Sequence, residues 1–334
     1  MLLEQSNSTL FHWMPRFLLA PVLIALQSFG GVASADEAVG RDAPVVSIQV
    51  DLSKFAKSSL GEALIQAGIT LAAAEMDKDP KAAMDAVVKS LGFNPLEQEI
   101  KINASVMDLE DPLDGLRLDV QLKDSTGNLE GLLLAAPEYR KSSYGEHTIH
   151  AATVDGNDKN VFAAFHTSDS GRKHITVAAT EAVVKASLDR LEQEPAGAGL
   201  HEMSEGQFVS VRLLSMPAEL SQVPPIATIG KMVNECSIEL SEEAESLVAK
   251  IRLVTTSEEQ ATQIQQLAQG AVAMVGLFKE EIRAELGDEV FASNVIPILD
   301  QIQVNREGNA VTVETRIPES LVIEFLREEA DLPL

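Results

Sequence analysis

Histidine side chains are the residues of this chain with the clearest chemical potential. An imidazole can bind a transition metal, and it can accept or release a proton near neutral pH. The sequence contains 6 histidines, and four of them fall within one short tract: His147, His150, His166 and His174. This tract makes metal binding and general acid–base chemistry the first hypotheses to examine.

The spacing of these histidines decides which of them could act together. His147 and His150 lie on a segment that alternates like a β-strand, and their odd spacing predicts that they point to opposite faces. His166 and His174 flank a turn sequence at residues 169–171, so a hairpin would place them nearly opposite each other on two strands. We therefore predict His166 and His174 as the metal ligands. Zinc needs a third ligand, which the sequence does not identify.

Other reactive groups show weaker patterns. Cys236 is the sole cysteine, and it alternates with Ile238 and Leu240, which predicts a buried thiol. The acidic residues of 108–114 and the turn at 155–160 do not have the ligand spacing of a calcium loop. The sequence also lacks a glycine-rich phosphate loop, a nucleophile elbow and a zinc-protease helix. No catalytic residue and no cofactor is predicted.

Alternating strands would hold the histidines in place. In residues 115–123, leucines and Val120 share one face while Arg117 and Asp119 share the other, which predicts a sheet with one face in water. Short turns between the strands favour antiparallel pairing. The predicted strands of this half are residues 100–106, 115–123, 129–135, 147–154, 161–167 and 174–179.

Helices interrupt the strands at recognisable caps. Pro80 begins and Gly92 ends one predicted helix, Thr180 caps another, and the sequence Ser257-Glu258-Glu259-Gln260 fits a capping box. Further helices are predicted at residues 60–77, at 217–234 and near the C-terminus, with a strand at 207–213 and hairpins at 236–254 and 302–316.

A strand that runs into a capped helix recurs along the chain. Residues 175–191 and 251–267 align without gaps, and looser copies occur at 45–64 and 311–326. The spacing of the copies is irregular, which excludes a solenoid. The sequence therefore predicts an α+β fold of two related domains, each a mainly antiparallel sheet covered by helices.

The N-terminal residues have the layout of a secretory signal peptide. Arg16 precedes an apolar run at residues 17–26, which is too short to cross a membrane, and Ala33-Ser34-Ala35 fits a cleavage site. Cleavage near Ala35 would leave a mature chain with no transmembrane segment, located in the periplasm or outside the cell. We predict a signal peptide at 1–35, an N-terminal domain at 36–193, a linker at 194–206 and a C-terminal domain at 207–334.

Charge and composition exclude several classes of protein. The chain has 26 Lys plus Arg against 51 Asp plus Glu, a formal net charge of -25. Nucleic acid is excluded as a partner, because its phosphates bind to basic surfaces. One cysteine excludes a disulfide framework.

Three tracts of the N-terminal half resemble a group of uncharacterised exported proteins from planctomycete-type bacteria. They are GEHTIHAATV at 145–154, VFAAFHTSD at 161–169 and ITVAATEAVVKASLDRLEQE at 175–194, and SLGFNPLEQEIKINASV at 90–106 is also similar. The resemblance covers residues 90–330 and implies export and a two-part α+β architecture. No activity is attached to that group.

These observations favour an exported, acidic, non-catalytic binding module or envelope-associated protein. Two alternatives stay open. One is a metal-assisted hydrolase that uses the cluster from His147 to His174. The other is a carrier of an apolar ligand, which would need a large cavity lined by Leu, Ile and Val.

Overall fold

The computed structural model describes residues 44–75, 79–107, 115–123, 129–134, 136, 138–153, 160–168, 171–193, 203–213, 229–277 and 298–329. The predicted signal peptide and most of the predicted linker therefore lie outside the described residues, as do the turns at 124–128 and 155–159. No helix of the described residues is long and apolar enough to cross a membrane.

The protein is an α+β protein whose strands pair in an antiparallel manner. It divides into two compact units, the first reaching Glu202 and the second running from Met203 to Leu332. The division falls within the predicted linker. That the two halves are related domains stays a prediction.

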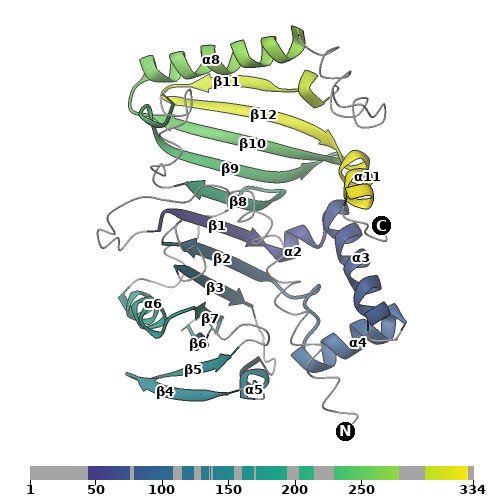
Figure 1. Ribbon diagram of the computed structural model, residues 1–334, viewed down its shortest axis with the longest axis vertical. Helices are drawn as coiled ribbons and strands as arrows, with labels where there is room; N and C mark the ends of the chain where they lie inside the picture. The colour runs from purple at the N-terminus through teal and green to yellow at the C-terminus, as the bar shows by residue number, and fades with distance from the viewer. Residues whose placement is uncertain are drawn as a thin grey trace. The chain divides into compact units, whose positions relative to one another are not determined.

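The described residues of the first unit form seven strands in the spatial order β1-β2-β3-β7-β6-β5-β4 (Figure 1). Consecutive strands in this order are antiparallel wherever their register is defined. Their bounds are β1 Val46–Asp51, β2 Ile100–Val106, β3 Leu116–Leu122, β4 Arg140–Tyr144, β5 His147–Thr153, β6 Asn160–Thr167 and β7 Lys173–Ala178. The strand β4 was not predicted.

One predicted strand of this unit is wrong. Residues 129–135 were expected to follow β3 as a strand of the meander, but Leu129–Leu134 forms the helix α5. The physical reason is visible in its sequence, LEGLLL, which has no β-branched or aromatic residue and several good helix formers. The place beside β3 is taken by β7 instead.

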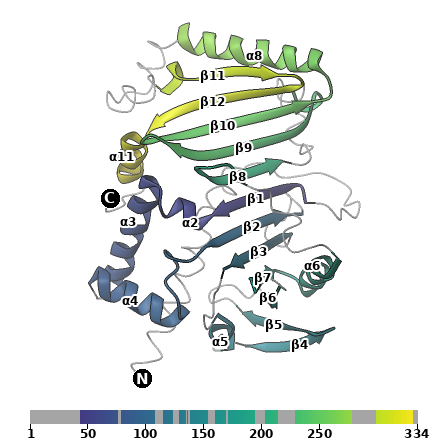
Figure 2. The same ribbon diagram turned by 180° about the vertical axis from the view of Figure 1, so that it is seen from behind.

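The other helices described in the first unit are α2 Leu52–Phe55, α3 Ser59–Glu75, α4 Pro80–Leu91 and α6 Glu181–Gln193. Helices α4 and α6 begin at the predicted signals, α3 covers most of the predicted helix 60–77, and α2 was not predicted as a separate helix. Asp79 caps α4 by accepting a hydrogen bond from the backbone N–H of Ala82, and Gly92 ends it in the left-handed conformation with φ 77°. Helices α3 and α4 lie beside the ends of the strands (Figures 1 and 2).

Apolar side chains fill one face of the strands β1 and β2. Ile48 and Ala104 have no exposed surface, and Val50 and Ile102 are each 1% exposed. Because side chains alternate along a strand, the residues between them point to the opposite face of the sheet. The helix α6 packs on part of that opposite face.

Within residues 203–213, 229–277 and 298–329, the second unit forms five strands in the order β11-β12-β10-β9-β8. Their bounds are β8 Gln207–Leu213, β9 Val233–Glu243, β10 Ser246–Thr255, β11 Gln303–Glu307 and β12 Ala310–Pro318, and the helices are α8 Glu258–Leu277 and α11 Glu319–Glu329. Both predicted hairpins are confirmed, as β9–β10 and β11–β12. The helix predicted at 217–234 lies mostly outside the described residues. Its end is wrong, because Val233 and Asn234 belong to β9.

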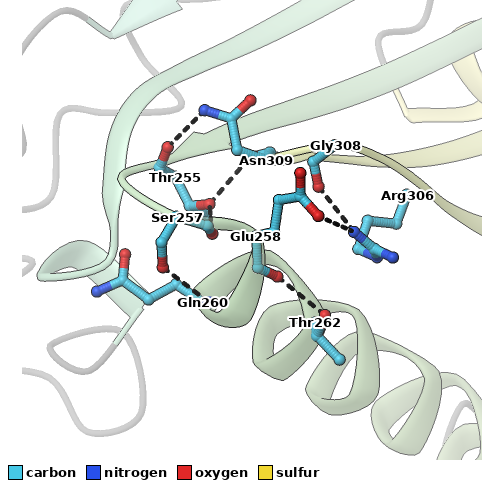
Figure 3. A network of polar contacts seen from close by, with 8 residues as sticks. All are labelled: Thr255, Ser257, Glu258, Gln260, Thr262, Arg306, Gly308 and Asn309. Atoms are coloured by element: carbon cyan, nitrogen blue, oxygen red, sulfur yellow. Dashed lines mark hydrogen bonds and ion pairs between the residues drawn. The ribbon is translucent and has the colours of Figure 1, made fainter.

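The capping box at the start of α8 is also part of a wider polar network. The Ser257 hydroxyl accepts a hydrogen bond from the backbone N–H of Gln260, as the sequence predicts (Figure 3). The Thr255 hydroxyl lies 2.7 Å from the carbonyl oxygen of Ser257 and 2.9 Å from that of Asn309. Asn309 in turn donates its side-chain amide to the Thr255 carbonyl. The turn between β11 and β12 thereby fixes the point at which α8 leaves β10.

The four predicted junctions of a strand with a helix are all present. They are β1 with α2, β7 with α6, β10 with α8 and β12 with α11. In the second unit α8 packs through Ala261 and Ile264 on a cluster that includes Val311 and Leu253.

Candidate functional site

Three of the four clustered histidines lie side by side on neighbouring strands. His166 of β6 and His174 of β7 are register partners, which confirms the predicted hairpin pairing. Continuing the β5–β6 register from Ile149 and Ala164 by two residues places His147 next to His166. The ring centroids are 5.4 Å apart for His147 and His166, and 6.2 Å apart for His166 and His174. We call these three residues the histidine row.

The histidine row points to the side of the sheet on which α6 packs. Val184 and Leu188 of α6 form a buried cluster with Ile149, Ala164 and Ala178. Each of these strand residues is an even number of positions from a histidine of the row, so it shares that histidine's face. The apolar contact of α6 and the histidine row therefore lie next to each other on one face.

His150 lies on the opposite face, as its spacing from His147 predicts. Its Nδ1 is 2.9 Å from the Tyr139 hydroxyl, and its Nε2 is 3.7 Å from a carboxylate oxygen of Glu130. The Phe165 ring meets it edge-on at 5.5 Å between centroids. Burial lowers the pKa of His150, and the Glu130 charge only partly opposes this. These contacts account for the His150 side chain as a structural group.

Polar side chains extend the histidine row across β7, β3 and β2. In the strand register, His174 lies opposite Gln121, which lies opposite Lys101 on the next strand. Thr176 lies opposite Asp119, which lies opposite Asn103. Arg117 lies opposite Ser105. We call this set of residues, together with the histidine row, the polar face: Lys101, Asn103, Ser105, Arg117, Asp119, Gln121, His147, His166, His174 and Thr176.

Much of the polar face is buried, which corrects one expectation from the sequence. The face of residues 115–123 that carries Arg117 was expected to lie in water, yet Arg117 is 4% exposed and Ser105 1%. Alternation shows only that the two faces differ, and the packing around the sheet decides which groups water can reach. The sequence therefore did not identify Arg117 as a site residue.

Hydrogen bonds satisfy some of these buried groups. The Arg117 Nε lies 2.8 Å from Asp119 Oδ2, and its Nη2 donates to the Ser105 hydroxyl at 3.3 Å. The Thr176 hydroxyl donates to Asp119 at 2.8 Å. An arginine two residues before an aspartate in a strand was the available signal, but only the neighbouring strands show that the pair is buried.

Three buried nitrogen atoms of the polar face have no hydrogen-bond partner among the described residues: Nε and Nη1 of Arg117 and Nε2 of His174. Of these, the Arg117 Nε still makes the ion pair with Asp119. Burial lowers the pKa of both side chains; the neighbouring His166 lowers that of His174 further, whereas Asp119 opposes the effect on Arg117. A buried polar group without a partner costs free energy, so native proteins contain few of them, mostly with a specific reason.

The predicted metal ligands stand next to each other, but a third is not in place. Among the described residues, no three His, Cys, Asp or Glu side chains converge so as to hold a metal ion. Metal binding by His166 and His174, and hydrolysis that depends on it, thus stay predictions. The structure adds His147, which the sequence pattern could not join to the pair because the residues between β5 and β6 do not predict the register of these two strands.

A small depression opens beside the polar face. It is lined by Glu99, Lys101, Gln121, Leu122, Lys123 and Arg172, and its volume of about 10 Å³ is roughly that of one water molecule. Glu99 lies 3.7 Å from the ammonium group of Lys101 and 3.5 Å from that of Lys123. This depression is polar, and it does not favour the apolar-carrier hypothesis.

Cys236 and the apolar surface of the second unit lie apart from the histidines in sequence. Cys236 is half-buried rather than buried, and burial raises the pKa of its thiol, which disfavours the reactive thiolate. Large apolar side chains are exposed on α8, where Leu267 is 50% and Leu277 81% exposed. A carrier of an apolar ligand stays a prediction.

Comparison with known proteins gives this chain no family. No protein-family model and no curated protein matches it. Solved structures with some likeness include crystal form III of TP0453, with a TM-score of 0.41 and 9% identity over 90% of this chain and 97% of that chain. Crystal form I of TP0453 gives a TM-score of 0.38 and 10% identity over 90% of this chain and 96% of that one. At this level of likeness, no property of TP0453 carries over to this chain.

Proposed function

We propose that this chain is an exported, non-catalytic binding module and that the polar face of its first unit is the binding surface. The observation that carries the proposal is the buried Nε2 of His174, which has no hydrogen-bond partner in the described part of the chain and lies in a row of three imidazoles. A sheet face that only had to pack would gain stability from apolar residues at these positions. Polar groups that lower the stability of the fold at such positions are typical of residues that a protein retains for function.

The burial of the histidines on the polar face suits a polar ligand. His174 is 6% exposed and Thr176 2% exposed, so both side chains are held in fixed positions by their surroundings. His147 and His166 are partly exposed and can be reached from solvent. A fixed inner group beside accessible outer groups is the arrangement that binding sites use to combine orientation with access.

A substitution of His174 tests whether the polar face is kept for binding. His174→Leu removes the unpartnered nitrogen at nearly constant volume, so we expect the free energy of unfolding to rise by about 1 kcal/mol. The matched control is His150→Leu, which removes an equally buried imidazole that has partners; we expect it to lower the free energy of unfolding by a similar amount. Urea unfolding of both variants measures the two effects.

The direction of the change in unfolding free energy of His174→Leu decides whether the proposed binding surface stands. A loss of stability in His174→Leu as large as that in His150→Leu would mean that the His174 ring is a structural group, and the proposed binding surface would lose its main support.

Export is part of the same proposal. It is supported by the signal-peptide layout of residues 1–35 and by the resemblance to exported planctomycete-type proteins, which also supports two related α+β domains and an envelope location, periplasmic or extracellular. The protein isolated from its native host is expected to begin at Asp36. Its intact mass measures this directly, and retention of residues 1–35 in most molecules would contradict export by cleavage.

A further inference from the structure

The outer pair of the histidine row is closer together than the pair that the sequence selected. The ring centroids of His147 and His166 are 5.4 Å apart with an interplanar angle of 67°, whereas those of His166 and His174 are 6.2 Å apart. Two imidazoles that share one tetrahedral ion, with metal–nitrogen bonds of about 2.0–2.1 Å, have centroids roughly 5 Å apart. The centroid distance of the His147–His166 pair is close to this value.

Access from solvent also favours the outer pair. A metal ion arrives hydrated and must exchange some of its waters for imidazole nitrogens. His147 and His166 are both partly exposed, while His174 is 6% exposed. An ion shared by His147 and His166 lacks the third protein ligand that zinc sites normally have, so waters must fill its remaining positions and the site should bind more weakly than a three-ligand site.

Electrostatics and ligand chemistry agree with a cation. The formal net charge of -25 raises the concentration of cations around the protein. Neutral imidazole suits zinc, copper and nickel, and copper binds most tightly among the divalent ions of the first transition row.

We propose that His147 and His166 together bind one divalent ion of the late first transition row, Zn²⁺ or Cu²⁺, each through one imidazole nitrogen. This inference rests on the proposed function, because it names the ligand class of the same polar face. His174, at the β7 end of the row, does not bind the ion directly. The site thus differs from the pair predicted by the sequence, with His166 as the shared member.

Copper titration of the full chain, produced without a histidine tag, tests the site. We expect one equivalent of Cu²⁺ to bind with nitrogen couplings in the electron paramagnetic resonance spectrum. His147→Gln and His166→Gln should each weaken binding at least about 100-fold, because losing even a supporting group outside the ligand set costs roughly 10- to 100-fold. His174→Gln should weaken binding less than either of these variants, because His174 belongs to the polar face without binding the ion directly. The control His201→Gln, the same substitution at a histidine outside the row, should leave the affinity nearly unchanged.

Thermal unfolding provides a second readout that a misfolded variant cannot imitate. Without metal, the midpoints of His147→Gln and His166→Gln should stay close to that of the parent chain. Added Zn²⁺ should raise the midpoint of the parent and of His174→Gln, but not of the other two variants.

Two patterns of binding among the variants would overturn the inference, and so would the absence of any metal binding. One is a loss of binding in His174→Gln with binding kept in His147→Gln, which would place the ion between His166 and His174. The other is copper binding that survives in the double variant of His147 and His166. If no metal binds while His174→Leu still gains stability, the metal inference fails and the proposed binding surface stands; if that gain is missing as well, both fail.

Discussion

Replacing Gly61 by alanine is expected to destabilise the protein by about 2 kcal/mol or more, although alanine is the better helix former by about 1 kcal/mol. A Cβ atom at Gly61 would stand 1.7 Å from the carbonyl oxygen of Phe55 and 2.6 Å from its carbonyl carbon. Both are backbone atoms, so no side-chain rotation can relieve the overlap. The end of α2 and the start of α3 would have to move apart.

The contacts around Gly61 explain why this movement is costly. The Ser58 hydroxyl accepts a hydrogen bond from the N–H of Gly61 at 2.9 Å and donates one to the Phe55 carbonyl at 2.6 Å. Ser58 is 5% exposed, so water cannot readily replace these bonds. Separating the two helices would break the cap of α3 as well as relieve the overlap.

Gly270→Ala is the matched control for the Gly61 prediction. Gly270 lies in the helix α8, and nothing stands within 4 Å of the position of its Cβ atom. There the helix propensity of alanine acts alone, so we expect a gain of about 0.5–1 kcal/mol. Denaturant unfolding of both variants measures the contrast. Equal effects in the two variants would show that the close approach at Gly61 is not maintained in solution.

Leu188→Ala is expected to lower the free energy of unfolding by about 2–5 kcal/mol. Leu188 is 1% exposed and packs with Val184, Ile149, Ala164 and Ala178 in the cluster that holds α6 on the sheet. Two of these neighbours are alanines, whose short side chains cannot extend into the space that Leu188 leaves. A cavity should therefore remain, and it adds to the lost transfer free energy.

Leu134→Ala makes the same chemical change at a leucine of the first unit that is 55% exposed. Its expected effect is within about 0.5 kcal/mol, because no buried contact is lost. Urea unfolding of the pair gives both values. A cost below 1 kcal/mol for Leu188→Ala would mean that α6 does not anchor the face beside the histidine row.

The sequence by itself determined the elements whose signals are local. Pro80 and Gly92 bound α4 because proline lacks the N–H that a first helical turn leaves unpaired and glycine adopts the left-handed end. Ser257 and Gln260 set the start of α8. Alternation predicted most strands, and the turn between His166 and His174 predicted their pairing. Each of these signals depends on residues only a few positions apart.

Tertiary structure decided which strands lie next to each other and which polar groups are buried. The segment after β3 folds as α5, which its own residues favour, and tertiary structure places β7 next to β3. This places His174 beside Gln121 and brings Arg117 into a buried face. His147 joins the histidine row through the β5–β6 register. Burial and the choice of neighbouring strands arise from contacts between distant residues, and periodicity within one strand does not identify which strand will lie beside it.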